Sequence, residues 1–148
     1  MPKAQFEAAR ILISDPASRP RRLIIANHYP LETPTLYAKE LAIKRLKNAW
    51  EVEAWLQTIG RHLYCCGHVH AAWAFVPKGL SEQVCINAGA PLLRDPTGLR
   101  PPGFVEITLH DRDVSVLHHA WDGRDWVIRP LYQNPAFFPE RSESSAVS

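Results

Sequence analysis

The chain has 148 residues, of which 46% are hydrophobic and 22% are charged, and its formal net charge is +2. This length predicts one domain, and so small a net charge does not indicate nucleic-acid binding, which normally needs a concentrated basic face. No window approaches the roughly 20 apolar residues of a membrane span, and the N-terminus has no apolar core like that of a signal peptide. The sequence therefore predicts a cytoplasmic protein without a membrane partner, and its cysteines are expected to be reduced.

The first part of the chain alternates helix and strand signals. Residues 5–14 favour a helix, which Asp15 and Pro16 would end. Residues 23–26 form a short, apolar and partly β-branched run, which fits a fully buried strand better than an alternating edge strand. Such a strand would deliver His28 to the carboxyl end of a sheet.

Residues 34–60 carry apolar side chains among lysine, arginine and glutamate, with no proline or glycine between Pro34 and Gly60. This pattern predicts one or two amphipathic helices. Thr33 is a suitable N-cap before a proline at the first helical position, and Gly60 is a suitable stop. A second strand is expected at residues 62–66.

Beyond residue 70 the pattern changes to short strands separated by turn signals. Strands are expected at residues 72–76, 83–87, 104–109, 113–118 and 125–128. The fold class is therefore α/β, with strand-helix-strand units first and an antiparallel meander later. We expect a domain over residues 1–135 and a disordered polar tail over residues 136–148.

Histidines follow two of the expected strands. A strand places side chains i and i+2 on one face, so His68 and His70 are expected to point into one cavity, with Gly67 keeping the backbone beside them uncluttered. His28 would lie at the end of the first strand. Three imidazoles at strand ends suggest a metal site, and His28, His68 and His70 are its predicted ligands.

A different metal site is an alternative. Cys66 shares the parity of His68 and His70, so these three residues, with Cys85 from a neighbouring strand, form a candidate mononuclear zinc site. Structural zinc sites usually space their cysteines as Cys-x2-4-Cys, and that spacing is absent here. A cysteine within an apolar strand more often serves as a small core residue.

The order of the motifs resembles the C-terminal half of the calcineurin-like metallophosphoesterases, a family of binuclear-metal phosphatases and phosphodiesterases. That family has a strand ending in His-x-Pro, then helices, a strand ending in Gly-His-x-His, an Asn-x-Gly segment and closing antiparallel strands. This chain has His28-Tyr29-Pro30, Gly67-His68-Val69-His70 and Asn87-Ala88-Gly89 in the same order. The resemblance implies an α/β sandwich of mixed sheets flanked by helices.

The resemblance also implies a hydrolase that cleaves phosphate mono- or diesters by means of a metal-bridging hydroxide. Its cofactors would be two divalent ions, of Mn, Fe or Zn. By the same resemblance, His28 and His68 bind one ion and His70 binds the other. A phosphate ester is the implied substrate.

The family's N-terminal motifs, Asp-x-His, Gly-Asp and Gly-Asn-His-Asp/Glu, are absent from this sequence. They supply the bridging carboxylate and most of the remaining ligands, so we expect the first half of the fold to be missing, the dimetal site to be incomplete and the chain to be inactive alone. A second chain that carries the N-terminal half is a candidate partner. The alternative is a non-catalytic pseudo-enzyme or partner module, which lacks the dimetal centre and pairs through an exposed sheet edge.

Overall fold

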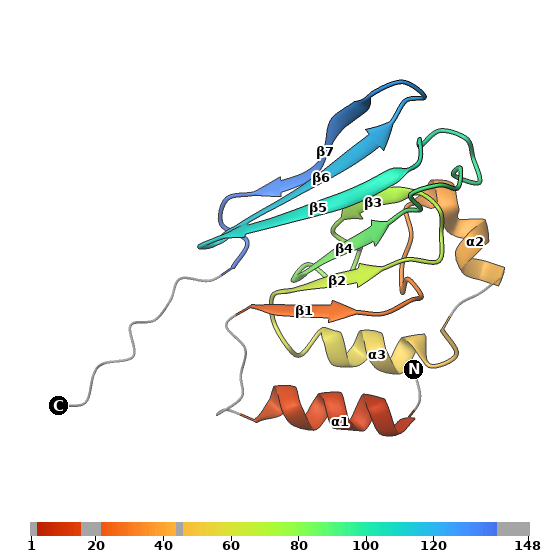
Figure 1. Ribbon diagram of the computed structural model, residues 1–148. Coiled ribbons are helices and arrows are strands. Elements are labelled where there is room, and N and C mark those ends of the chain that lie inside the picture. The colour runs from red at the N-terminus through yellow and green to blue at the C-terminus, as the bar shows by residue number, and fades with distance from the viewer. Residues whose placement is uncertain (1–2, 16–21, 44–45, 139–148) are drawn as a thin grey trace.

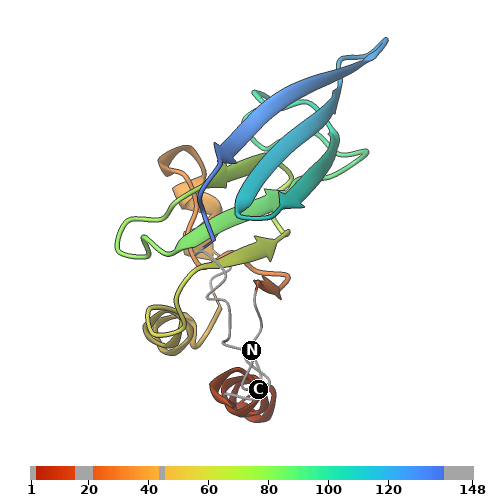
Figure 2. The same cartoon turned by 90° about the vertical axis from the view of Figure 1, so that its left-hand side faces the viewer.

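The computed structural model describes residues 3–15, 22–43 and 46–138, and this part of the chain forms three layers (Figures 1 and 2). Helices cover one face of a four-stranded sheet, and a three-stranded sheet covers the other face. The mixed α/β class predicted from the sequence is confirmed. No helix in the described part of the chain is long and apolar enough to cross a membrane.

The four-stranded sheet contains β1 (Leu23–Ala26), β2 (His62–Cys66), β3 (Ala72–Phe75) and β4 (Gln83–Ala88). Its strand order is β1-β2-β4-β3, with β1, β2 and β4 parallel and β3 antiparallel to β4. The three-stranded sheet is an antiparallel meander of β5 (Gly103–His110), β6 (Asp113–Trp121) and β7 (Trp126–Asn134). Parallel strands followed by a meander are the arrangement that the sequence predicts.

The strand β1 lies at the edge of its sheet, and in the described part of the chain no strand pairs with its outer side. Ile25 packs against the core on the helix side, whereas Ile24 points the other way and is 50% exposed. The prediction of a fully buried strand is therefore wrong. An apolar run fixes the strand, but burial depends on neighbouring strands, and the three-stranded sheet leaves half of Ile24 uncovered.

The described helices are α1 (Lys3–Ser14), the 3-10 turn η1 (Thr35–Tyr37), α2 (Ala38–Ile43) and α3 (Ala49–Leu56). Residues 34–60 thus hold more than one helix, in agreement with the sequence pattern. Thr33 does not cap them, because the residue before η1 is Pro34, which makes no side-chain capping bond. The hydroxyl of Thr33 is buried and has no hydrogen-bond partner among the described residues.

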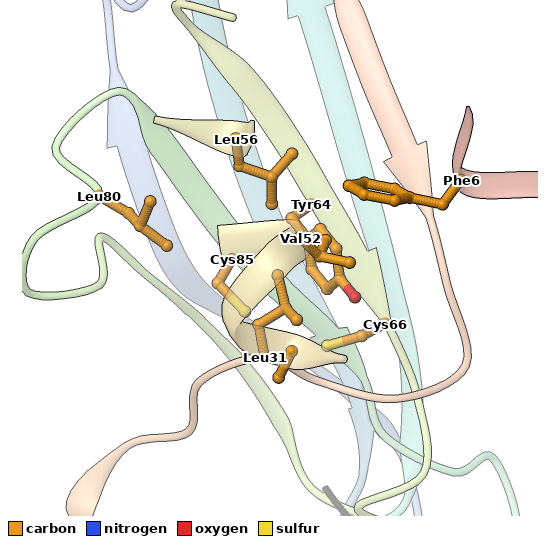
Figure 3. Close-up of a cluster of buried hydrophobic side chains, with 9 residues drawn as sticks. Phe6, Leu31, Val52, Leu56, Tyr64, Cys66, Leu80 and Cys85 are labelled. Carbon is orange, nitrogen blue, oxygen red and sulfur yellow. The ribbon is translucent and has the colours of Figure 1, made fainter. Parts of the chain in front are cut away.

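A first hydrophobic core lies between the helices and the four-stranded sheet (Figure 3). Phe6 of α1 and two residues of α3, Val52 and Leu56, pack there against Tyr64 and Cys66 of β2. These strand side chains point to the helix side because they stand two residues apart on β2. α1 is therefore part of the domain, although residues 16–21, between it and β1, lie outside the described part of the chain.

A second core lies between the two sheets. Leu63 of β2 and Ile86 of β4 pack there against Val114 and Val116 of β6. Residues 137 and 138, both phenylalanine, are buried in the same core although they fall in the predicted tail. The packed domain therefore extends to residue 138, and the rest of the predicted tail lies outside the described residues.

Candidate metal site

The carboxyl ends of β1 and β2 lie side by side and are joined by backbone hydrogen bonds. The amide of Asn27 donates to the Cys65 oxygen at 2.9 Å, and the amide of Gly67 donates to the His28 oxygen at 3.1 Å. These bonds continue the parallel pairing of β1 with β2 beyond the ends of both strands. They hold the backbone of His28 against the segment that follows β2.

The structure brings His28 and His68 together. Nδ1 of His68 lies 3.3 Å from Nε2 of His28, and the ring centroids are 5.3 Å apart. The ring of Tyr29 packs against both imidazoles, with centroid distances of 4.9 Å to His28 and 4.8 Å to His68. Two residues that are distant in the sequence therefore present their ring nitrogens to one point at this edge of the sheet.

Strand alternation, from which His68 and His70 were expected to share a face, does not apply at these residues. β2 ends at Cys66, and His68 lies in a bend with a left-handed backbone, at φ 68°. Gly67 has no steric role either, because a methyl group there would meet the nearest atoms of His28 at ordinary contact distances of 3.8 and 3.9 Å. A backbone turn at His68, rather than a shared strand face, directs its imidazole toward His28.

His70 is exposed and does not complete the pair. In residues 3–15, 22–43 and 46–138, no three histidine, cysteine, aspartate or glutamate side chains are grouped so that they could hold a metal ion. The expected convergence of His68 and His70 in one cavity is thus not seen. Among the described residues, His28 and His68 thus form a pair without a third side chain of these types grouped with them.

The alternative zinc site is not formed either. The thiol of Cys66 is buried in the core between the helices and the four-stranded sheet. It donates there to the Ile86 oxygen at 3.3 Å and lies 3.5 Å from Oδ1 of Asn87. A hydrogen bond with Cys85, together with burial, raises the pKa of the Cys66 thiol. A zinc ligand has to be a thiolate, so this environment opposes metal binding by Cys66.

The buried side chain of Asn87 fixes the turn that carries both histidines of the Gly-His-x-His motif. Its Nδ2 donates to the backbone oxygens of Val69 and Ala71, each at 2.6 Å. Close behind it, Gly89 has φ 72°, and a Cβ there would lie 3.0 Å from the amide nitrogen of Ala72. The Asn-x-Gly segment therefore has a structural function, which is to hold this turn against β4.

A second polar chain supports the His28 side of the pair. Asn27 donates from Nδ2 to the Tyr64 hydroxyl at 3.0 Å, and that hydroxyl donates to the Tyr29 oxygen at 2.9 Å. Burial raises the pKa of Tyr64, so the phenol stays protonated and remains a donor. Sequence reasoning missed this function because a tyrosine in an apolar strand looks like an ordinary core residue.

The geometry of the histidine pair fits two ligands of one ion. Imidazole nitrogens bind zinc at about 2.0–2.1 Å, which places two ligands of a tetrahedral ion about 3.4 Å apart. The 3.3 Å between the His28 and His68 nitrogens is close to that value. A complete site needs further ligands, and the described residues supply none beside the pair.

No protein-family model matches the chain, and no curated protein shows significant similarity to it.

Proposed function

We propose that the His28–His68 pair is part of the metal site of a phosphoesterase that hydrolyses phosphate mono- or diesters. The observation that supports this proposal is the 3.3 Å separation of two ring nitrogens held at the ends of adjacent parallel strands. When bound, divalent ions would neutralise phosphate charge and activate a water molecule. The order of the sequence motifs adds the second part of the argument, because it resembles a family with that activity.

The residues of this chain have distinct functions in the proposed site. His28 and His68 offer ring nitrogens to one ion, and the turn held by Asn87 sets the position of His68. His70 follows on the same turn and is exposed. There it could bind a second ion together with ligands from a partner. Tyr29 shields one side of the imidazole pair from solvent.

The remaining ligands are proposed to come from a second polypeptide segment paired with β1. The outer side of β1 pairs with no strand in the described part of the chain, and its Ile24 is half exposed. Unpaired strand edges recruit further strands. A strand added in parallel to β1 would end beside His28, where it could deliver carboxylates.

Metal binding tests the proposal directly. The full chain is loaded with Mn²⁺ or Zn²⁺, and bound metal is measured after gel filtration together with release of p-nitrophenol from phosphate mono- and diesters. We expect metal retention that falls at least about tenfold in His28→Ala and His68→Ala, as removal of a first ligand predicts. His110→Ala is the matched control, because that histidine is 81% exposed and lies far along the chain at the end of β5. Equal retention in all three variants would overturn the proposal.

A non-catalytic module is a second candidate, and the same contact supports it. At 3.3 Å the two imidazoles can share a hydrogen bond with each other, which satisfies one nitrogen of each ring without metal. This function predicts no stoichiometric metal in the purified protein. It also predicts that Ile24→Lys, which places a charge on the exposed edge, weakens association with a partner while leaving the fold intact.

A further inference from the structure

A second candidate site lies between the loop that follows β4 and the three-stranded sheet, and neither histidine of the pair lines it. Residues of the loop between β4 and β5, the end of β6 and the first half of β7 line an open cavity of about 520 Å³. Figure 1 shows this loop beyond the carboxyl ends of β2 and β4. A volume of this size falls within the range of small-molecule sites, which hold about 300–1,000 Å³.

The cavity is strongly basic. Arg94, Arg100 and Arg129 line it, whereas Asp122 is the one acidic residue among its described lining. The Asp122 carboxylate accepts backbone hydrogen bonds from residues 124 and 125, at 2.8 and 2.9 Å. Within the described part of the chain, none of the three guanidinium groups makes an ion pair or a side-chain hydrogen bond. The cavity thus offers planar guanidinium donors, whose geometry matches phosphate.

The loop that carries two of these arginines is held rigidly. The carboxylate of Asp95, which is 4% exposed, accepts backbone hydrogen bonds from Thr97, Leu99 and Arg100 at 2.9–3.1 Å. It also accepts one from the Tyr37 hydroxyl at 3.0 Å. Arg94 and Arg100 flank this anchor, so their backbones are fixed before any ligand binds. Such preorganisation reduces the entropy that binding would cost.

A buried histidine stands close to the arginines. His118 is 1% exposed, and its Nδ1 has no hydrogen-bond partner among the described residues. The positive charges of Arg100 and Arg129 are near enough to help lower the pKa of His118, after burial as the first cause. A buried polar atom normally has a hydrogen-bond partner, so the unpaired Nδ1 of His118 is a costly feature. Arg94 and Arg129 are exposed, so their guanidinium groups remain accessible to a ligand.

The rest of the wall is apolar and includes one aromatic surface. Trp121 lines the cavity and is 37% exposed. Its ring also packs against the ring of Trp126, with 5.4 Å between the centroids. Leu99, Pro101 and Pro102 complete this side. A ligand that fills the cavity therefore needs an uncharged part that can contact an indole, in addition to its anionic group.

We propose that this cavity binds a nucleoside phosphate, with the phosphate on Arg94, Arg100 and Arg129 and the base against Trp121. The basic part of the cavity accounts for the phosphate, the indole for a planar ring, and the volume for a ligand of mononucleotide size. The proposal does not rest on the His28–His68 pair, because it uses none of its residues.

Calorimetry with adenosine monophosphate, carried out in EDTA so that no metal takes part, tests the proposal. Arg100→Ala and Arg129→Ala each remove one charged hydrogen-bond donor, so we expect affinity to fall at least about tenfold in each. Arg124→Ala is the matched control, because Arg124 is 92% exposed on the turn after β6 and does not line the cavity. We expect its affinity to equal that of the unaltered chain.

Two ligand controls separate the phosphate from the base. Inorganic phosphate and adenosine should each bind more weakly than the nucleotide, because each makes only part of the contacts. Trp121→Ala should weaken nucleotide binding at least about fivefold, because base stacking is lost, and should leave inorganic phosphate binding unchanged. No nucleotide binding at about 1 mM, a fall in Arg124→Ala equal to that in Arg100→Ala, or equal affinity for phosphate and nucleotide would each overturn the proposal.

Discussion

The Tyr37 hydroxyl donates a hydrogen bond to Oδ2 of Asp95 at 3.0 Å, and this bond joins η1 to the loop between β4 and β5. Asp95 is buried and accepts several other hydrogen bonds within its own loop. Burial by itself would raise the pKa of Asp95, but hydrogen bonds from Thr97, Arg100 and Tyr37 outweigh it and lower the pKa. The ionised carboxylate is therefore the form that holds this loop.

Asp95→Asn should destabilise the protein by about 1–3 kcal/mol, because one acceptor oxygen is replaced by a donor that faces other donors. Since the folded pKa of Asp95 is lowered, its stabilisation is present above the unfolded value near pH 4 and lost as the pH falls through the folded pKa. The variant should therefore also lose less stability on acidification. Urea unfolding at pH 7 and below pH 4 measures both effects.

Asp113→Asn is the control for that variant, because Asp113 is exposed at the start of β6. It should change the free energy of unfolding by no more than about 0.5 kcal/mol, as is usual for surface substitutions. A comparable loss in the two variants would show that the Asp95 hydrogen bonds do not stabilise the loop.

Asn87→Asp should cost about 2–4 kcal/mol, because it removes the donors to the Val69 and Ala71 oxygens and places a carboxyl group against two carbonyls. The same exchange at Asn134 is the control. Asn134 accepts from the Ala136 amide at 3.0 Å through Oδ1, and aspartate retains that acceptor. Thermal unfolding of the two variants checks the difference. Similar melting temperatures would contradict the inference that Asn87 stabilises the turn through these two hydrogen bonds.

Gly89→Ala should be more destabilising than Gly60→Ala although both positions have nearly the same backbone. Their φ angles are 72° and 74°, so the left-handed conformation costs both variants about the same, roughly 1 kcal/mol. A Cβ at Gly89 lies 3.0 Å from the Ala72 nitrogen, whereas one at Gly60 meets nothing within 4 Å. The extra loss at Gly89, about 1–3 kcal/mol, measures the steric contact. Denaturant midpoints that shift equally would exclude it.

Stability should decline as the pH falls below about 6.5 because of His118. Burial, and then the charges of Arg100, Arg129 and His119, lower the pKa of His118 in the folded protein. The unfolded chain then binds the proton first, so stability is full above the unfolded pKa and is lost on acidification, by up to about 1.4 kcal/mol per pH unit.

His118→Leu removes that proton-binding group and its unpartnered buried nitrogen, so the variant should be at least as stable at pH 7 and should lose less stability between pH 6.5 and 5. His110→Leu, at a position where the histidine is 81% exposed, should retain the pH dependence of the unaltered chain. Chemical unfolding as a function of pH measures these slopes. Parallel curves for all three proteins would contradict a lowered pKa at His118.

Local pattern predicts the elements of this fold well and their surroundings less well. The bounds of β1 and β2 agree with the apolar runs that predict them, because such runs between turn residues leave few alternatives. Whether β1 is buried depends on strands that lie beside it in space, and periodicity does not contain that information. Thr33 illustrates the same limit. It is a residue type suited to capping, but η1 begins one residue later than predicted, so Pro34 occupies the capping position.

The candidate site was predictable to a similar extent. Motif order indicated that His28 and His68 meet, and they do. The left-handed backbone of His68 was not predictable, because residues other than glycine seldom adopt it. The basic cavity was not predictable either, since Arg94 lies in the loop after β4 and Arg129 in β7, and only the fold brings these distant segments together.

The alternation of side chains along β2 has a consequence for how the domain unfolds. Tyr64 contributes to the core beneath the helices, and its neighbour Leu63 contributes to the core between the sheets. Loss of either outer layer would expose one row of large apolar side chains on β2 and β4, so neither layer can detach at low cost. We therefore expect helix signals and sheet signals to disappear in a single cooperative transition.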